Sequence, residues 1–205
     1  SSALVPLLRF ARLPLPLCPL RVGALPCCSY PSSSAAAFGT AARFLWAAGM
    51  YAVQLVGGRE VVETVRALVA NGIAVMAHVG LTPQRVAQLG GFKVQAKTSR
   101  AARRLIDDAL ALEDAGAFSI VLESVPAPVA QLTSERLAIP TIGIGAGPGC
   151  DGQVLVLHDV LGRIGEFKPT CAKRNAERGP GCSDAPARAH AAVRRGRGPG
   201  AAPRT

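Results

Sequence analysis

Short apolar runs alternate with longer amphipathic stretches through the middle of this chain, a pattern typical of repeated strand–helix units. Each run is rich in valine, isoleucine and leucine and ends at a polar or glycine residue, as buried parallel strands do. The predicted strands are residues 52–56, 73–77, 118–123, 139–144 and 153–157. The predicted helices are residues 60–70, 99–115 with Thr98 as the N-cap, and 128–137.

Strands that alternate with helices pair in parallel, and the even spacing of these repeats favours a barrel over an open sheet. The expected fold class is therefore α/β, of the TIM (β/α)8 barrel type. Five strands cannot close a barrel of eight, and residues 47–173 are about half of the roughly 250 residues of a complete one. We expect an incomplete barrel with disordered termini.

The strand at 118–123 delivers one carboxylate, Glu123, to its C-terminal end. Chemistry in α/β barrels takes place at the C-terminal ends of strands, so Glu123 is a candidate catalytic acid or base. The structural alternative is that Glu123 caps the next helix or pairs with a nearby arginine. The next strand upstream ends in the same way, at His78, and a histidine that closes a strand often has only a structural role.

Six motifs follow one another in a fixed order between residues 76 and 156. They are MAHVGLTPQ (76–84), GGFKVQ (90–95), ALALEDAGA (109–117), LESVP (122–126), IPTIGIGAG (139–147) and DGQVLV (151–156). Each motif alone has little specificity, but in this order they resemble those of ketopantoate hydroxymethyltransferase. The resemblance covers about residues 47–173 and corresponds to barrel strands four to eight of that family. The first three strands are not recognisable in the sequence.

The resemblance implies a one-carbon transferase of pantothenate biosynthesis, in the coenzyme A pathway. Such enzymes move a hydroxymethyl group from 5,10-methylenetetrahydrofolate to 3-methyl-2-oxobutanoate, giving 2-dehydropantoate, with Mg2+ holding the keto acid. By position, Glu123 matches the family's proton acceptor, and His78 matches a histidine that faces the same cavity. Gln54 stands at the position of a substrate-binding lysine, and Val56 stands at that of a metal-binding glutamate.

These departures put the metal site in question. Valine cannot bind Mg2+, which takes oxygen ligands, and no Asp or Glu occurs before Glu60. The family's other metal ligands lie on the first three strands. We therefore expect no retained magnesium site. Two functional hypotheses follow: a hydroxymethyltransferase that is a fragment or impaired, or a noncatalytic half-barrel remnant or partner-binding homologue.

The two ends of the chain differ in composition from its middle. Residues 1–46 are rich in Arg, Ser and Pro and lack acids, which suits a mitochondrial transit peptide, disordered sequence or a faulty gene prediction. Residues 174–205 are rich in Pro, Gly, Ala and Arg, and we expect a disordered basic tail. We expect a mitochondrial location if 1–46 is a transit peptide, and otherwise a cytoplasmic one.

The net charge of +10 lies in residues 1–59, with five Arg and no acids, and in residues 174–205, with seven Arg against two acids. Residues 60–173 hold eleven basic and eleven acidic groups, so the sequence predicts no specific nucleic-acid partner. No uninterrupted apolar run approaches the ~20 residues of a membrane span, and the six cysteines lack metal-ligand spacing, so we expect free thiols. The resemblance implies a small-molecule substrate and, for a complete protein, a homo-oligomer.

Overall fold

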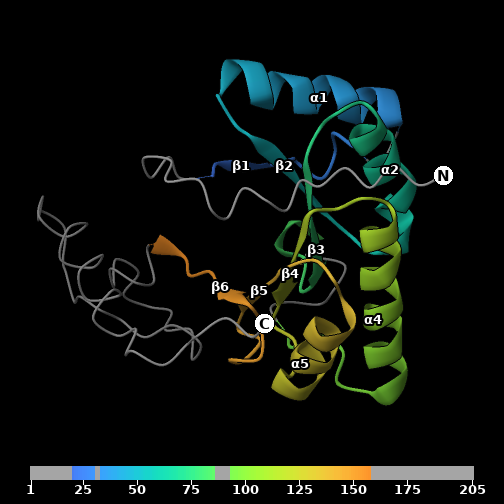
Figure 1. The fold of residues 1–205 in the computed structure, drawn as a ribbon, viewed down its shortest axis with the longest axis vertical. Helices are drawn as coiled ribbons and strands as arrows, with labels where there is room; N and C mark the ends of the chain where they lie inside the picture. Colours follow the sequence, from blue (N-terminus) through green and yellow to red (C-terminus); the bar gives the residue numbers. More distant parts are fainter. Residues whose placement is uncertain (1–19, 31–32, 86–92, 158–205) are drawn as a thin grey trace, which may run out of the picture.

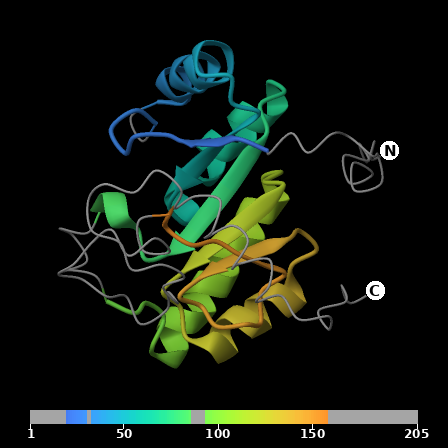
Figure 2. The same cartoon turned by 90° about the vertical axis from the view of Figure 1, so that its left-hand side faces the viewer.

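The computed structural model describes residues 20–30, 33–85 and 93–157. They form one six-stranded parallel sheet whose strands lie in chain order, β1 to β6 (Figure 1). Helices α2, α4 and α5 stand along one side of this sheet, and α1 lies beside α2 near β1. Seen after a quarter turn, the strands form a curved sheet (Figure 2). A curled parallel half-barrel confirms the predicted fold class, a partial (β/α)8 barrel.

The strands are short, as is usual in a barrel. They are β1 Val22–Ala24, β2 Ala52–Val56, β3 Val75–Gly80, β4 Ser119–Glu123, β5 Thr141–Ile144 and β6 Gly152–Gln153. The α-helices are α1 Ser34–Ala47, α2 Val62–Ala70, α4 Ser99–Asp114 and α5 Ala127–Arg136. Two 3-10 turns, η2 Arg59–Val61 and η3 Pro83–Arg85, follow β2 and β3 respectively.

Hydrophobic periodicity predicted the central elements well. β2 has the predicted bounds, and β3, β4 and β5 differ from prediction by a few residues at their ends. Thr98 caps α4 as expected, since its Oγ1 accepts a hydrogen bond from the backbone N–H of Ala101 at 3.2 Å. The predicted inner face of α4, with Leu105 and Leu112, is buried against the sheet.

β1 and all but the last residue of α1 lie in the segment 1–46, for which no element was predicted. β1 pairs in parallel with β2, with Ala24 opposite Gln54, so the sheet has six strands and not five. Ser33 caps α1 by accepting from the N–H of Ala36, and small residues on one side of the helix are buried. A three-residue strand and an alanine-rich helix give almost no periodic signal, which explains the error.

The last predicted strand is also shorter than expected. β6 ends at Gln153, and the N–H of Val154 makes one further bond to the carbonyl of Gly143. Beyond that point β5 offers no partner, because its chain turns away through glycines with positive φ at 145 and 147. Residues 154–157, predicted as strand, are consequently exposed.

Several predictions fall on residues that the structure does not describe. These include the transit-like or disordered character expected for residues 1–19 and the disordered basic tail expected for residues 174–205. Within the described ranges, no helix combines the length and the apolar character needed to cross a membrane.

Alternation along the strands separates two faces of the sheet. Val53 and Leu55 of β2, like the corresponding residues of β3 and β4, join a core shared with the helices. The residues between them point to the opposite, inner face, where Gln54, His78 and Glu123 lie. The sheet therefore sorts apolar side chains to the helices and these polar groups to the inside of the half-barrel.

Tyr30 ties the segment before α1 to β2. The side chain is fully buried, its hydroxyl donates to the carbonyl of Val56 at 2.8 Å, and it accepts from the N–H of the same residue at 3.3 Å. A buried hydroxyl thus pairs with the main chain at the end of β2, where the sheet turns into the next loop.

We predict that Tyr30→Phe lowers the free energy of unfolding by about 1–3 kcal/mol, because it leaves a buried main-chain carbonyl without its partner. Denaturant unfolding measures this. Tyr51→Phe is the matched control: Tyr51 is half exposed and keeps its ring over Arg21, so we expect a change within about 0.5 kcal/mol. Equal effects of the two substitutions would contradict the role of the Tyr30 hydroxyl.

Candidate functional site

Three polar side chains from three adjacent strands meet on the inner face of the sheet. Gln54 lies in β2, His78 near the end of β3, and Glu123 is the last residue of β4. The register pairs Val56 with His78 and His78 with Val121, so alternate residues of the strands share this face. The structure thus brings together all three polar residues that the sequence singled out.

His78 is the centre of this group. Its Nε2 lies 3.1 Å from Oε2 of Glu123 and 2.9 Å from the carbonyl oxygen of Leu81. Its Nδ1 lies 2.7 Å from the side-chain nitrogen of Gln54. The side chains of His78 and Glu123 are only 8% and 16% exposed, so little water competes with these contacts.

The main chain around Glu123 is held from both sides. Its carbonyl accepts from the N–H of Leu81 at 2.8 Å, and the N–H of Ser124 donates to Ile144 at the same distance. Gly80 has φ +95, and a Cβ there would collide with the Glu123 carbonyl oxygen. Ser124 has φ +49, an uncommon conformation for a non-glycine residue, of the kind found at functional sites. The chain therefore leaves β4 abruptly and presents Glu123 at the rim.

A half-buried carboxylate beside an imidazole can accept a proton from a bound carbon acid, provided that the substrate reaches it. Across the described residues, His78 is the one ion-pair partner of Glu123. The structural alternative included an ion pair between Glu123 and a nearby arginine, and no arginine of the described part makes one.

The residues present do not fit the magnesium ion that the resemblance implies. Ala24, Gln54 and Val56 lie on the inner face at the ends of β1 and β2, and together they offer a single amide oxygen. Mg2+ is bound by one or two carboxylates with water and substrate oxygens. In the described part of the chain, no three His, Cys, Asp or Glu side chains are grouped so as to hold a metal ion.

A cavity of about 340 Å3 lies at the C-terminal ends of β2 and β3. Its lining includes Gly57 and Gly58 after β2, Gly80 at the end of β3, Thr82 after it, and Asp108 of α4. It therefore adjoins the rim where Gly80 pairs with Glu123.

Asp108 is buried at the base of this cavity. Its Oδ1 lies 3.3 Å from Nε of Arg59, and its Oδ2 lies 3.9 Å from Nε of Arg104. A Cβ at position 58 would collide with the carboxylate, so glycine is needed there. Burial raises the pKa of Asp108, and the two arginines oppose that rise. This aspartate joins α4 to the loop after β2.

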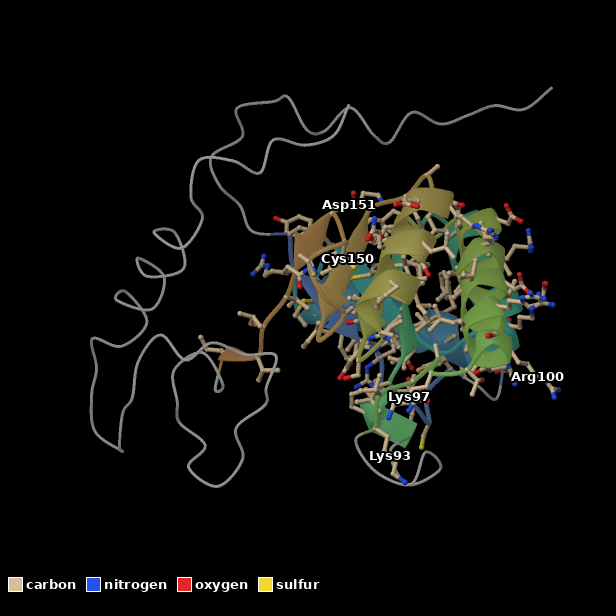
Figure 3. The ribbon with its side chains drawn as sticks, turned by 90° about the horizontal axis from the view of Figure 1, so that it is seen from below. Lys93, Lys97, Arg100, Cys150 and Asp151 are labelled. Atoms are coloured by element: carbon tan, nitrogen blue, oxygen red, sulfur yellow. The ribbon has the colours of Figure 1, made fainter. Side chains whose placement is uncertain are left out.

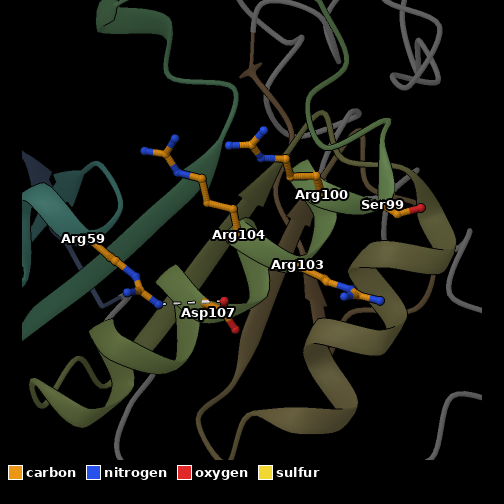
Figure 4. Close-up of a pocket in the computed structure, with 6 residues that line it drawn as sticks. All are labelled: Arg59, Ser99, Arg100, Arg103, Arg104 and Asp107. Atoms are coloured by element: carbon orange, nitrogen blue, oxygen red, sulfur yellow. Dashed lines mark ion pairs between the residues drawn. The ribbon is translucent and has the colours of Figure 1, made fainter.

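A second, more open cavity of about 660 Å3 lies over the start of α4 (Figure 4). Arg100 and Arg104 extend on the same side of the helix, Arg103 points away from them, and Arg59 pairs with Asp107 at 3.8 Å. Its lining lacks a histidine and is distinct from the Gln54, His78 and Glu123 group. Arginines in this setting can attract anions, but they carry no proton acceptor.

Cys150 and Asp151, in the loop before β6, have a structural role. Figure 3 shows Cys150 and Asp151 on the side opposite to Lys93 and Lys97. Asp151 Oδ2 accepts from the N–H of Thr141 at 2.8 Å and from its hydroxyl at 2.9 Å, which fixes the loop before β6 to β5. Burial raises the pKa of the Cys150 thiol. Cys27, Cys28 and Cys150 are free thiols, in agreement with the prediction for the described cysteines.

Sequence reasoning missed two parts of the site. Tyr30 lies in the segment that was expected to be structureless, and only its contact with Val56 reveals its role. The positive φ of Ser124 has no signature in its residue type, although the Glu-Ser-Val-Pro sequence after a strand marks a sharp turn. An alternating pattern around Tyr30 would have been needed to find it, and none is present.

Comparison with known sequences gives a single family. Residues 18–201 match the sequence profile of ketopantoate hydroxymethyltransferase. The chain is 54% identical over 180 residues to a 3-methyl-2-oxobutanoate hydroxymethyltransferase of Nitratidesulfovibrio vulgaris, covering 88% of this chain and 59% of that protein. It is 56% identical over 155 residues to the protein of the same name from Syntrophus aciditrophicus, covering 76% and 57%. The chain thus spans about three fifths of the length of these curated relatives.

The profile match includes residues 18–46, which the resemblance seen in the sequence alone had left out. Among solved structures, a chain of the Amycolatopsis orientalis BexX/CysO complex aligns with 65% of this chain and 56% of its own length, at 15% identity and a TM-score of 0.44. That likeness is too weak to carry an argument.

The raised pKa of Asp108 predicts a direction for stability against pH. The folded protein holds this proton more tightly than the unfolded chain, so the group favours folding increasingly as pH falls through the folded pKa toward the unfolded value near 3.9. We expect the unfolding free energy of the wild type, minus that of Asp108→Asn, to rise as pH falls from 7 toward about 4. Asp107→Asn, on the exposed neighbour, controls for loss of a charge. A difference that becomes smaller as pH falls from 7 toward about 4 would show that the two arginines outweigh burial.

We predict that calorimetric titration of the purified, chelator-treated chain with Mg2+ gives no stoichiometric site of sub-millimolar affinity. Gln54→Lys combined with Val56→Glu should not create magnesium-dependent hydroxymethyl transfer, because it adds one carboxylate while Ala24 opposite supplies none. The untreated titration buffer is the control. A saturable one-to-one isotherm for the wild type would show that residues outside the described ranges complete a site.

Proposed function

Because the chain belongs to the ketopantoate hydroxymethyltransferase family, we propose that it acts in hydroxymethyl transfer to 3-methyl-2-oxobutanoate, with 5,10-methylenetetrahydrofolate as co-substrate and 2-dehydropantoate as product. The observation that carries the proposal is the Glu123 carboxylate, held 3.1 Å from His78 on the inner face of the sheet. It has the position and the surroundings of a proton acceptor for a small carbon acid.

In the proposed reaction, the C3–H bond of the keto acid breaks and its proton passes to Glu123. The electron pair left behind forms the enolate, whose C3 attacks the methylene carbon of the folate. The methylene carbon loses its two bonds to folate nitrogens and gains one bond to C3 of the keto acid and one to the oxygen of a water. Glu123 returns the C3 proton to one of the released folate nitrogens, and the second proton of the water goes to the other, which balances the cycle.

The described residues supply the acid–base half of this chemistry. His78 holds the carboxylate from one side, and the clamped main chain of Leu81 and Ser124 fixes where it points. Such preorganisation favours proton transfer because the acceptor need not reorient. No step is assigned to magnesium, since the donors at the ends of β1 and β2 do not fit it.

The apolar character of Ala24 and Val56 at these strand ends favours a second candidate, a noncatalytic half-barrel that binds a partner. In that case the Glu123 and His78 pair is a structural remnant of the family's site. Enolisation of the keto acid separates the two candidates, because it needs a working base but no folate. A mitochondrial location and homo-oligomer formation stay predictions from the sequence.

We predict that Glu123→Gln slows 2-dehydropantoate formation by about 10²–10⁴-fold, the usual contribution of a positioned acid–base group. The same substitution should slow deuterium exchange at C3 of 3-methyl-2-oxobutanoate in heavy water, followed by proton NMR. Fold and keto-acid binding should be retained, because glutamine has nearly the same shape.

Glu63→Gln is the matched control, since that side chain is 85% exposed on helix α2, outside the sheet that carries Glu123. It should leave both rates unchanged. A Glu123→Gln chain with wild-type exchange and transfer would move the role elsewhere. A wild-type chain that catalyses neither exchange nor transfer would favour the noncatalytic candidate.

A further inference from the structure

The two ring nitrogens of His78 face chemically opposite partners. Nδ1 lies 2.7 Å from Nε2 of Gln54, which is an amide NH2 group and can only donate. Nε2 lies 2.9 Å from the Leu81 carbonyl oxygen, which can only accept. A neutral imidazole offers one acceptor and one donor, so both contacts are satisfied only when Nε2 carries the proton.

Burial makes this choice of tautomer consequential. His78 is 6% exposed and sits in the middle of the sheet, between β2 and β4. A ring nitrogen with the wrong tautomer would meet a like group with no water to replace the lost bond. Such a mismatch costs about 1–3 kcal/mol for one buried group, enough to populate one tautomer almost completely.

We propose that Gln54 is a positioning residue that fixes the Nε2-protonated tautomer of His78 and thereby keeps Glu123 as a carboxylate acceptor. The N–H at Nε2 donates to the Leu81 carbonyl at 2.9 Å, and Oε2 of Glu123 lies 3.1 Å from the same nitrogen. In the other tautomer, the Nε2 lone pair would face Glu123. Glu123 would then need to be protonated to make the contact, and a protonated carboxyl cannot accept a proton.

The orientation of the Gln54 amide is the point on which the proposal turns. If its oxygen faced Nδ1, both ring nitrogens would have to donate and His78 would be an imidazolium. The two arrangements give different protonation states at Nδ1, which can be measured directly. Lysine, which the family resemblance implies at this position, can also only donate, so a donor toward Nδ1 is the property that glutamine would preserve.

The consequence for catalysis rests on the proposed function, but the tautomer itself does not. The test therefore begins with a spectroscopic reading that needs no activity. The chain has three histidines, His78, His158 and His190. The full-length chain carrying His158→Gln and His190→Gln, labelled with 15N histidine, gives one imidazole whose nitrogen shifts and couplings report which nitrogen is protonated.

Three variants at position 54 are compared in that background. With Gln54 present, we expect the neutral Nε2-protonated form. Gln54→Lys should retain it, because an ammonium also donates. Gln54→Glu, of nearly equal size, replaces the donor with an acceptor and should move a proton to Nδ1. An imidazolium or Nδ1-protonated ring with Gln54 present, or no change of protonation in the glutamate variant, would overturn the proposal.

The kinetic arm follows in the chain with its natural histidines. Gln54→Glu should lower kcat for C3 deuterium exchange at least tenfold with little change in KM. With acceptors facing both ring nitrogens, His78 would become an imidazolium, and its charge would hold the Glu123 carboxylate and make it a weaker proton acceptor, while the cavity keeps its shape. Gln54→Lys, which keeps a donor toward Nδ1, should retain more of the exchange rate than Gln54→Glu does. If the protonation of His78 changes in Gln54→Glu but the exchange rate does not, Gln54 has no role in keeping Glu123 active as a base, and the proposal fails. If the wild type shows no exchange at all, the proposed function fails, whereas the tautomer result stands.

Discussion

Parallel pairing of β2, β3 and β4 is the constraint on which the rest of this molecule depends. Because side chains alternate with a period of two, a fixed register puts Gln54, His78 and Glu123 on the same face of three neighbouring strands. A slip of one residue in β3 would send His78 to the helix side and bring a valine or an alanine to the inner face. The polar group is thus a direct result of strand register, and the buried valines and leucines on the other face enforce that register.

Main-chain contacts hold this arrangement more than side-chain chemistry does. Tyr30 binds the carbonyl and the N–H of Val56, Leu81 binds the carbonyl of Glu123, and Gly80 leaves room for that approach. Each contact fixes where a strand ends without using the side chain that faces the inner surface. The histidine is the exception, since it joins neighbouring strands through its ring.

Hydrophobic periodicity was enough to predict the central strands and α4, because each buries a regular apolar face. It also placed Glu123 and His78 at strand ends, and a parallel sheet then required them to be neighbours. It failed where structure depends on distant partners. β1 is too short to show alternation and exists because β2 offers it an edge, and Tyr30 acts on a residue 26 positions away. The conformation of Ser124 depends on the clamped ends of neighbouring strands, which no local pattern encodes.

The Tyr30 contact has a consequence for how such a site can change over time. Because the hydroxyl recognises the backbone of residue 56 and ignores its side chain, that position can exchange a carboxylate for a valine without loosening the end of β2. Architecture and ligand chemistry are then free to diverge. A lineage could lose ion binding by drift while retaining a well-folded scaffold, and an engineer could rewrite the rim of this half-barrel residue by residue without first repairing its fold.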